Sequence, residues 1–179
     1  ENVLLAAATA DGTTVLHNAA REPEIEDLCG YLNACGARIA VEKDGVITIE
    51  GVEALHGCRH EVIPDRIETA TYMAAAAVTG GTLLLRNARP EHVNTVFPAF
   101  EEAGCQVSVW KDEILISAPS RLRRVKTIRT MPYPGFPTDA QAPLMAMACL
   151  ADGTSVFIET IFENRYKHAG ELMRLGAKI

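Results

Sequence analysis

The chain has 179 residues, of which 48% are hydrophobic, 22% charged and 6% aromatic, a balance that excludes disordered and collagen-like polymers and predicts a soluble globular protein. It has 17 basic and 23 acidic residues, a formal charge of −6, so nothing predicts binding to nucleic acid or an anionic membrane surface. The longest uncharged stretch, residues 69–85, is shorter than the ~20 residues of a membrane-spanning helix.

The N-terminus and the cysteines together predict a cytoplasmic protein. No basic segment precedes the first apolar residues, so no secretory signal is visible. The five cysteines are odd in number and form no C-x-x-C pair, and most lie among apolar residues, as reduced buried thiols do.

The sequence repeats itself at residues 1–39, 68–107 and 141–179. Each segment carries a Gly-Thr pair and, at a nearly constant distance beyond it, a second glycine. These glycines are Gly12 and Gly36, Gly81 and Gly104, and Gly153 and Gly176. Such self-similarity predicts a fold built from repeated structural units.

Each repeat begins with an alanine-rich apolar stretch, which predicts a buried helix that stops at a glycine in the C′ position. A short apolar run follows and predicts a strand. The runs lie at residues 13–16, 82–85 and 154–157.

An amphipathic helix is expected next, ending at the second glycine. Its apolar positions are Ile25, Leu28 and Leu32 in the first repeat and Val93, Val96, Phe97 and Phe100 in the second. Two alternating strands close the unit. They are expected at 38–41 and 46–49, around a turn at Lys43-Asp44-Gly45, and at 106–110 and 113–117.

One further strand is expected before each later alanine-rich helix, around residues 60–63 and 125–129. The unit is then β-α-β-α-β-β, and the fold class is α/β with sheet packed on helix. By this count the first unit lacks its opening strand and the third its closing pair. The chain is therefore expected to be cut at both ends, with apolar surface meant for missing neighbours.

The segment 131–141 precedes a helix, and its three prolines and one glycine predict a defined extended path. Thr138 and Gln141 match the S/T-x-x-E/Q capping box, which is the favoured reading of the spacing. In the alternative reading, the same geometry holds the Asp139 carboxylate at a cleft edge, where it accepts a proton or orients a sugar hydroxyl.

The segment 159–166 departs from the other repeats because it gathers two acids, an amide and a cation. Its structural interpretation is a helix start with acids near the positive end of the dipole. Arg165 is equally suited to pairing with a substrate phosphate or carboxylate and to an inter-domain salt bridge. Helix caps are predicted at Asp65-Arg66-Ile67-Glu68 and at Glu22-Pro23-Glu24.

Motifs of several enzyme classes are absent. The five histidines show no H-E-x-x-H or comparable spacing, so no metal site is expected. No G-x-G-x-x-G after a strand, P-loop or G-x-S-x-G motif occurs, which excludes the usual carriers of dinucleotide binding, nucleoside triphosphate binding and serine hydrolysis.

Four ordered strings nevertheless resemble the UDP-N-acetylglucosamine enolpyruvyl transferases, relatives of the 5-enolpyruvylshikimate-3-phosphate synthases. They are N-A-A-R-E-P-E-I at 18–25, P-D-R-I-E at 64–68, P-Y-P-G-F-P-T-D at 132–139 and E-T-I-F-E-N-R at 159–165. The resemblance extends over essentially the whole chain.

This resemblance implies an inside-out α/β barrel of two lobes with the active site between them. Residues 1–63 would be the last unit of one lobe, and residues 64–179 two units of the other, the third unit truncated. The family moves the enolpyruvyl group of phosphoenolpyruvate to the 3′-hydroxyl of UDP-N-acetylglucosamine and releases phosphate. The reaction serves peptidoglycan precursor synthesis, and so cell wall, cell shape and cell division, and it needs no cofactor.

The resemblance also implies roles for four residues. Asp139 would contact the sugar 3′-hydroxyl and act as its general base, Ile161 backbone would touch the nucleotide sugar, Thr138 would support Asp139, and Arg165 would help to organise the closed cleft. The family's reactive-cysteine loop and phosphoenolpyruvate-binding residues find no match here. The chain alone is therefore expected to be inert, with the remaining segments of the same enzyme as its partners.

Two other readings stay open. One is a shikimate-pathway enolpyruvyl transferase, which would bind shikimate 3-phosphate instead. The other is a non-catalytic repeat scaffold or nucleic-acid module, which the −6 charge disfavours.

Overall fold

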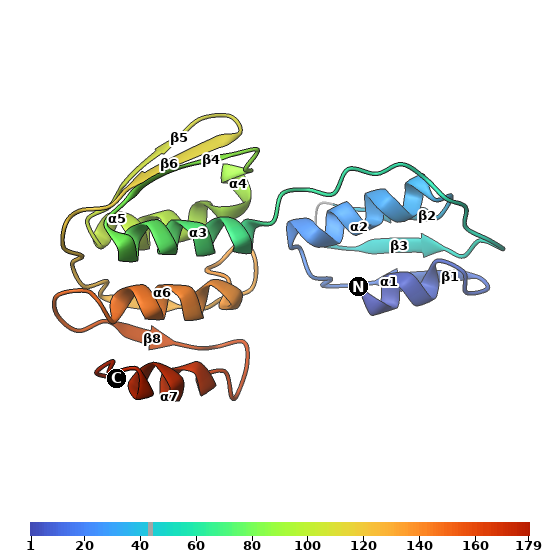
Figure 1. Cartoon of the computed structure of the whole chain (residues 1–179). Helices are drawn as coiled ribbons and strands as arrows, with labels where there is room; N and C mark the ends of the chain where they lie inside the picture. The colour runs from blue at the N-terminus through green and yellow to red at the C-terminus, as the bar shows by residue number, and fades with distance from the viewer. Residues whose placement is uncertain (43–44) are drawn as a thin grey trace. The chain divides into compact units, whose positions relative to one another are not determined.

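The computed structural model describes residues 1–42 and 45–179, so Lys43 and Asp44 of the predicted turn lie outside the described residues. The described residues divide into two units, Glu1–Ile63 and Pro64–Ile179, each with its own hydrophobic core (Figure 1). Within these ranges, no helix has the length and apolarity that crossing a membrane would require.

The first unit packs two helices against a three-stranded antiparallel sheet of order β1-β3-β2. Its elements are α1 (Asn2–Ala7), β1 (Thr13–Leu16), α2 (Pro23–Ala34), β2 (Arg38–Val41) and β3 (Ile47–Glu50). Alternate residues of β3 face one side, so Ile47 and Ile49 are buried among Leu4, Ile25 and Leu32. The predicted strands and amphipathic helix of the first repeat are confirmed.

The second unit begins with the same arrangement. It contains α3 (Arg66–Thr79), β4 (Thr82–Arg86), α4 (Pro90–Val93), the 3-10 helix η1 (Asn94–Val96), α5 (Phe97–Glu102), β5 (Gln106–Val109) and β6 (Glu113–Ser117). The sheet order β4-β6-β5 repeats β1-β3-β2, again antiparallel throughout. The structure thus confirms an α/β fold built from repeats.

The third repeat adds a parallel pair of strands to this unit. Its elements are β7 (Thr127–Arg129), the 3-10 helix η2 (Thr138–Ala140), α6 (Gln141–Ala148), β8 (Val156–Ile158) and α7 (Lys167–Arg174). Parallel strands need a crossover, which η2 and α6 supply between β7 and β8. Figure 1 shows α3 between the sheet β4-β6-β5 and α6, and α3 contacts both.

The second amphipathic helix is broken, although its apolar positions are correct. Val93, Val96 and Phe100 are buried in the core. The helix divides into α4, η1 and α5, because Pro98 has no backbone N–H to donate to the carbonyl of Asn94. The Phe97 N–H bonds that carbonyl instead, in the tighter 3-10 pattern.

The alanine-rich helices differ from the prediction in two of the three repeats. Helix α1 is only half buried, with Val3 and Leu5 each 51% exposed, because one face alone meets the sheet. Only α3 ends on a left-handed glycine, Gly80. Helices α1 and α6 end earlier, and Gly12 and Gly153 adopt positive φ in the turns before the next strands.

The strand predicted at 60–63 is wrong, whereas the strand predicted at 125–129 is confirmed as β7. Residues 51–65 form neither helix nor strand, and Val62 is 72% exposed. An alternating segment becomes a strand only where a neighbouring strand takes its backbone hydrogen bonds. No backbone in the described part of the chain pairs with residues 60–63.

Both predicted helix starts are confirmed. Pro23 is the first residue of α2, with Glu24 in the first turn. At α3, Oδ1 of Asp65 accepts hydrogen bonds from the backbone N–H groups of Ile67 (2.7 Å) and Glu68 (3.1 Å).

Replacing the α3 cap tests its contribution to stability. We expect Asp65→Ala to lower the free energy of unfolding by about 1 kcal/mol, because two N–H groups lose their acceptor. Urea unfolding followed by circular dichroism measures the change. Asp65→Ser keeps a side-chain oxygen and should retain most of the stability, so equal losses in the two variants would contradict the capping role.

Candidate functional site

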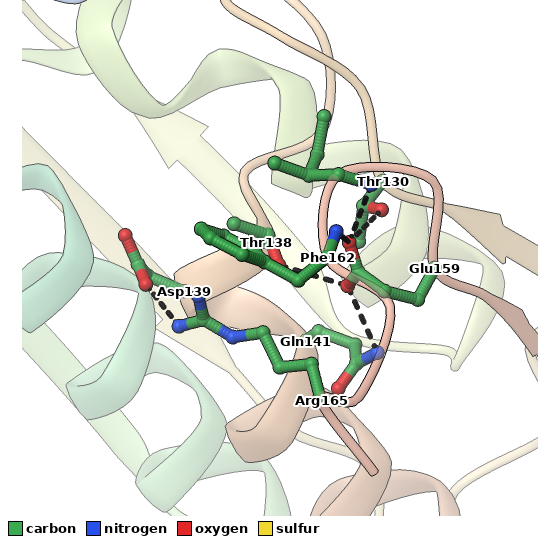
Figure 2. A network of polar contacts seen from close by, with 8 residues as sticks. Thr130, Thr138, Asp139, Gln141, Glu159, Phe162 and Arg165 are labelled. Carbon is green, nitrogen blue, oxygen red and sulfur yellow. Dashed lines mark hydrogen bonds and ion pairs between the residues drawn. The ribbon is translucent and has the colours of Figure 1, made fainter.

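The carboxylate of Glu159, directly after β8, accepts five hydrogen bonds (Figure 2). Its Oε1 accepts from Thr130 Oγ1 (2.9 Å) and from the backbone N–H groups of Ile161 (2.8 Å) and Phe162 (3.2 Å). Its Oε2 accepts from Thr138 Oγ1 (2.8 Å) and Gln141 Nε2 (3.2 Å). One side chain therefore joins three segments of the chain.

The parallel strands explain why these segments meet. Thr130 follows β7 and Glu159 follows β8, so both lie at the same end of the strand pair. The crossover between the strands brings η2 and the start of α6, with Thr138 and Gln141, to that end. The carboxyl ends of parallel strands are a common place for ligand sites in α/β proteins.

Further hydrogen bonds fix the loop that follows Glu159. The fully buried Thr130 accepts the Thr160 N–H at its Oγ1 over 2.9 Å. The Tyr166 hydroxyl accepts the Glu159 N–H (2.8 Å) and donates to the Phe157 carbonyl (3.0 Å). The loop is thus shaped by side chains, since it contains no helix or strand of its own.

The surroundings of Glu159 lower its pKa. Burial of the carboxyl acts to raise the pKa, because it disfavours the charge. The hydrogen bonds from the Ile161 N–H, the Thr138 and Thr130 hydroxyls and the Phe162 N–H outweigh that effect. The pKa of Glu159 therefore lies below its ordinary value, and the group is ionised at neutral pH.

Asp139 and Arg165 form an ion pair at the open side of this network (Figure 2). Arg165 Nη2 donates to Asp139 Oδ1, and the two side chains are 35% and 51% exposed. The Arg165 guanidinium also lies over the Phe162 ring, 4.9 Å from its centroid. No described residue hydrogen-bonds Asp139 Oδ2, so this oxygen can receive a ligand hydroxyl.

The proline-rich segment before η2 forms a turn, so the predicted extended path is wrong for residues 131–136. The Met131 N–H donates to the Phe136 carbonyl (2.9 Å), and the Gly135 N–H to the Pro132 carbonyl (2.8 Å). A Cβ at Gly135 would lie 2.4 Å from the Met131 Cβ, so the turn requires glycine. Pro137 is extended and leads into η2.

The capping box predicted for Thr138 and Gln141 is also wrong. No side chain caps η2 or α6, and both residues bind Glu159 instead. The helix start predicted within 159–166 is a loop, and α7 begins only at Lys167. The salt bridge of Arg165 joins it to Asp139 within the second unit.

The structure brings the four predicted site residues, Thr138, Asp139, Ile161 and Arg165, into one neighbourhood. The sequence reasoning missed Glu159, Thr130 and Gln141 as site residues. A signal for Glu159 existed, since the repeat alignment places it opposite Asn18 and Asn87. Both asparagines adopt positive φ (52° and 55°), a conformation that asparagine tolerates. Glu159 does not adopt positive φ, and its carboxylate binds the loop that follows.

The arrangement offers a proton acceptor beside a fixed cation. Across residues 1–42 and 45–179, no three His, Cys, Asp or Glu side chains gather where they could hold a metal ion. Asp139 can accept a proton or a hydroxyl hydrogen bond, and Arg165 can hold a negative charge.

Comparisons with known proteins find relatives that are all named as carboxyvinyl or enolpyruvyl transferases. The family model described as EPSP synthase (3-phosphoshikimate 1-carboxyvinyltransferase) matches residues 1–179. Two proteins named UDP-N-acetylglucosamine 1-carboxyvinyltransferase are similar over all 179 residues, at 54% identity in Psychrobacter arcticus and 50% in Dichelobacter nodosus. The chain spans 42% of the length of each.

A solved structure shares the fold. The enolpyruvyl transferase NikO from Streptomyces tendae superposes with a TM-score of 0.81 at 27% identity. The match covers 97% of this chain and 41% of that chain.

Replacing the carboxylate of Glu159 tests its part in the network. A group with a lowered pKa stabilises the fold above its ordinary pKa, and that contribution is lost as the pH falls. We expect Glu159→Gln to reduce the free energy of unfolding by roughly 1–2 kcal/mol near neutral pH, a figure moderated by partial solvent exposure. The difference should shrink below about pH 4.3, the ordinary glutamate pKa.

Urea unfolding of both proteins between neutral pH and about pH 3 measures this difference. Glu171→Gln is the control, because Glu171 forms only an exposed ion pair with Arg174 and should change stability little. A Glu159→Gln difference that stays constant with pH would show that the charge does not hold the loop.

Proposed function

The chain belongs to the EPSP synthase family, and we propose that it forms part of an enolpyruvyl transferase acting on UDP-N-acetylglucosamine. The enzyme moves the enolpyruvyl group of phosphoenolpyruvate to the sugar 3′-hydroxyl and releases phosphate. The observation that carries this proposal is the 50% and 54% identity, over all 179 residues, to two proteins named UDP-N-acetylglucosamine 1-carboxyvinyltransferase.

By this proposal the protein serves peptidoglycan precursor synthesis, and thus cell division, from the cytoplasm. Its substrates are the two small molecules, and no cofactor takes part. Residues 1–63 belong to one lobe of the enzyme and residues 64–179 to the other. The rest of the enzyme supplies the groups that hold phosphoenolpyruvate.

Asp139 is the general base of the proposed reaction. A free alkoxide is too basic to form, so a positioned carboxylate takes the proton of the 3′-hydroxyl as the carbon–oxygen bond develops. Arg165 binds Oδ1 of Asp139, which leaves Oδ2 to accept that proton. Thr138 supports Asp139 as its neighbour in η2, where its hydroxyl is anchored to Glu159.

Ile161 contributes its backbone to the nucleotide sugar. Its N–H is already donated to Glu159 Oε1, so the carbonyl oxygen is the group that remains for a substrate hydroxyl or amide. Arg165 packs on Phe162 and pairs with Asp139, so it links the loop after β8 to η2.

A chimaera tests the proposed activity and the role of Asp139. Residues 1–179 replace the aligned segment of the Psychrobacter arcticus relative, which is 54% identical. We expect phosphate release that requires both UDP-N-acetylglucosamine and phosphoenolpyruvate. Asp139→Asn should lower kcat by about 10²–10⁴, because the amide cannot accept the proton.

Asp152→Asn is the matched control, because Asp152 forms an exposed ion pair with Arg121 in the same unit. It should leave phosphate release close to that of the chimaera. Near-normal turnover by Asp139→Asn would remove Asp139 from the role, and a folded but inactive chimaera would contradict the proposed reaction.

The acceptor is tested on the 179-residue chain itself by calorimetric titration. We expect weak binding of UDP-N-acetylglucosamine that Asp139→Ala abolishes, no binding of shikimate 3-phosphate, and no enolpyruvyl transfer by the chain alone. The family description names the shikimate substrate, so this comparison decides between the two acceptors. Binding of shikimate 3-phosphate without the nucleotide sugar would favour that alternative.

A further inference from the structure

Two free thiols from separate segments of the first unit lie next to each other. The Sγ atoms of Cys35 and Cys58 are 3.4 Å apart, and both residues are free cysteines. Cys35 follows α2 and is 5% exposed, whereas Cys58 is exposed. The remaining cysteines, Cys29, Cys105 and Cys149, are buried or half-buried, so Cys58 is the one that solvent reaches most readily.

The two segments are also joined through the backbone. The Cys35 N–H bonds carbonyls in the last turn of α2, which fixes its position. Its carbonyl accepts the N–H of His56 over 2.8 Å, two residues before Cys58. Beyond Cys58, His60 Nε2 lies 3.0 Å from Asp27 Oδ1 on the same helix. The thiol contact is therefore held on both sides.

We propose that Cys35 and Cys58 are a redox-sensitive dithiol, a modification site that a small-molecule disulfide such as oxidised glutathione converts into an intramolecular disulfide. An S–S bond is about 2.05 Å long, so the sulfur atoms must approach by roughly 1.3 Å. Residues 57–59, between the anchored His56 and His60, can supply this movement, because they belong to no helix or strand and form no backbone–backbone hydrogen bond with the described part of the chain.

The reaction proceeds by two exchanges. The exposed Cys58 loses its proton, and its sulfur attacks one sulfur of oxidised glutathione, releasing one glutathione thiolate and leaving a mixed disulfide. Cys35 then loses its proton, and its sulfur attacks the Cys58 sulfur, releasing the second glutathione. Two protein thiols are oxidised, one glutathione disulfide is reduced, and the two protons go to the two glutathione thiolates.

The same contact affects the reactivity of Cys58. The hydrogen bond with Cys35, and then burial, raise the pKa of the Cys58 thiol. The reactive form is the thiolate, so the raised pKa slows the first exchange at Cys58. Once formed, the bridge closes a covalent loop that contains β2 and β3. It also joins the segment leading to Pro64 to the end of α2.

Equilibration of the 179-residue chain with mixtures of oxidised and reduced glutathione tests the proposal. After acid quenching, free thiols are alkylated in denaturant and counted by mass spectrometry. We expect the alkylatable thiols to fall from five to three as oxidised glutathione rises. Trypsin should then release residues 22–38 joined to residues 44–59 by a disulfide.

Cys29 lies on the same tryptic peptide as Cys35, so Cys29→Ser is the matched control and should still form the bridge. In Cys35→Ser, we expect Cys58 to stop at the mixed disulfide with glutathione. The unsubstituted chain decides the question even if a variant folds poorly. Retention of five alkylatable thiols, a glutathionylated Cys58 as end product, or a bridge to any other cysteine would overturn the proposal.

Discussion

The hydrogen bonds that converge on the Glu159 carboxylate are the constraint on which the candidate site depends. The loop 159–166 has no regular backbone structure, so its shape must come from side chains. Glu159 binds two consecutive N–H groups of that loop and, with its other oxygen, two side chains from the crossover. An acceptor-only group suits this task, because every partner it meets is a donor.

This constraint works only because the third repeat has a parallel strand pair. In the antiparallel sheets, neighbouring strands end at opposite edges, and short turns connect some of them. In the β7-β8 pair, the crossover returns the chain to the edge where both strands end, so Thr130, Thr138 and Glu159 meet. Asp139 and Arg165 then lie at the open side of a fixed polar cluster.

The sequence predicted what depends on local periodicity. Alternation predicted the strand that contains the buried Ile47 and Ile49, helical spacing identified Val93, Val96 and Phe100, and the Asp65 cap followed from its own neighbours. The family resemblance, rather than spacing, selected Asp139 and Arg165 as site residues.

The errors came from partners distant in sequence. Thr138 and Gln141 have the spacing of a capping box, in which their side-chain oxygens would accept backbone N–H groups. Instead, both side chains donate to the Glu159 carboxylate, 21 and 18 residues away. Local spacing cannot reveal such a distant acceptor. Likewise, the alternation at 60–63 could not show that these residues would find no neighbouring strand among the described residues. The contact between Cys35 and Cys58 also depends on the folded chain and has no signal in local spacing.

The position that Glu159 shares with Asn18 and Asn87 shows how one repeated unit can carry different loops. Two copies of the repeat turn there through a backbone conformation with positive φ. In the third copy, the loop depends on one charged group instead. Exchange of a single residue at an equivalent position is thus enough to give the same β-strand a differently shaped continuation.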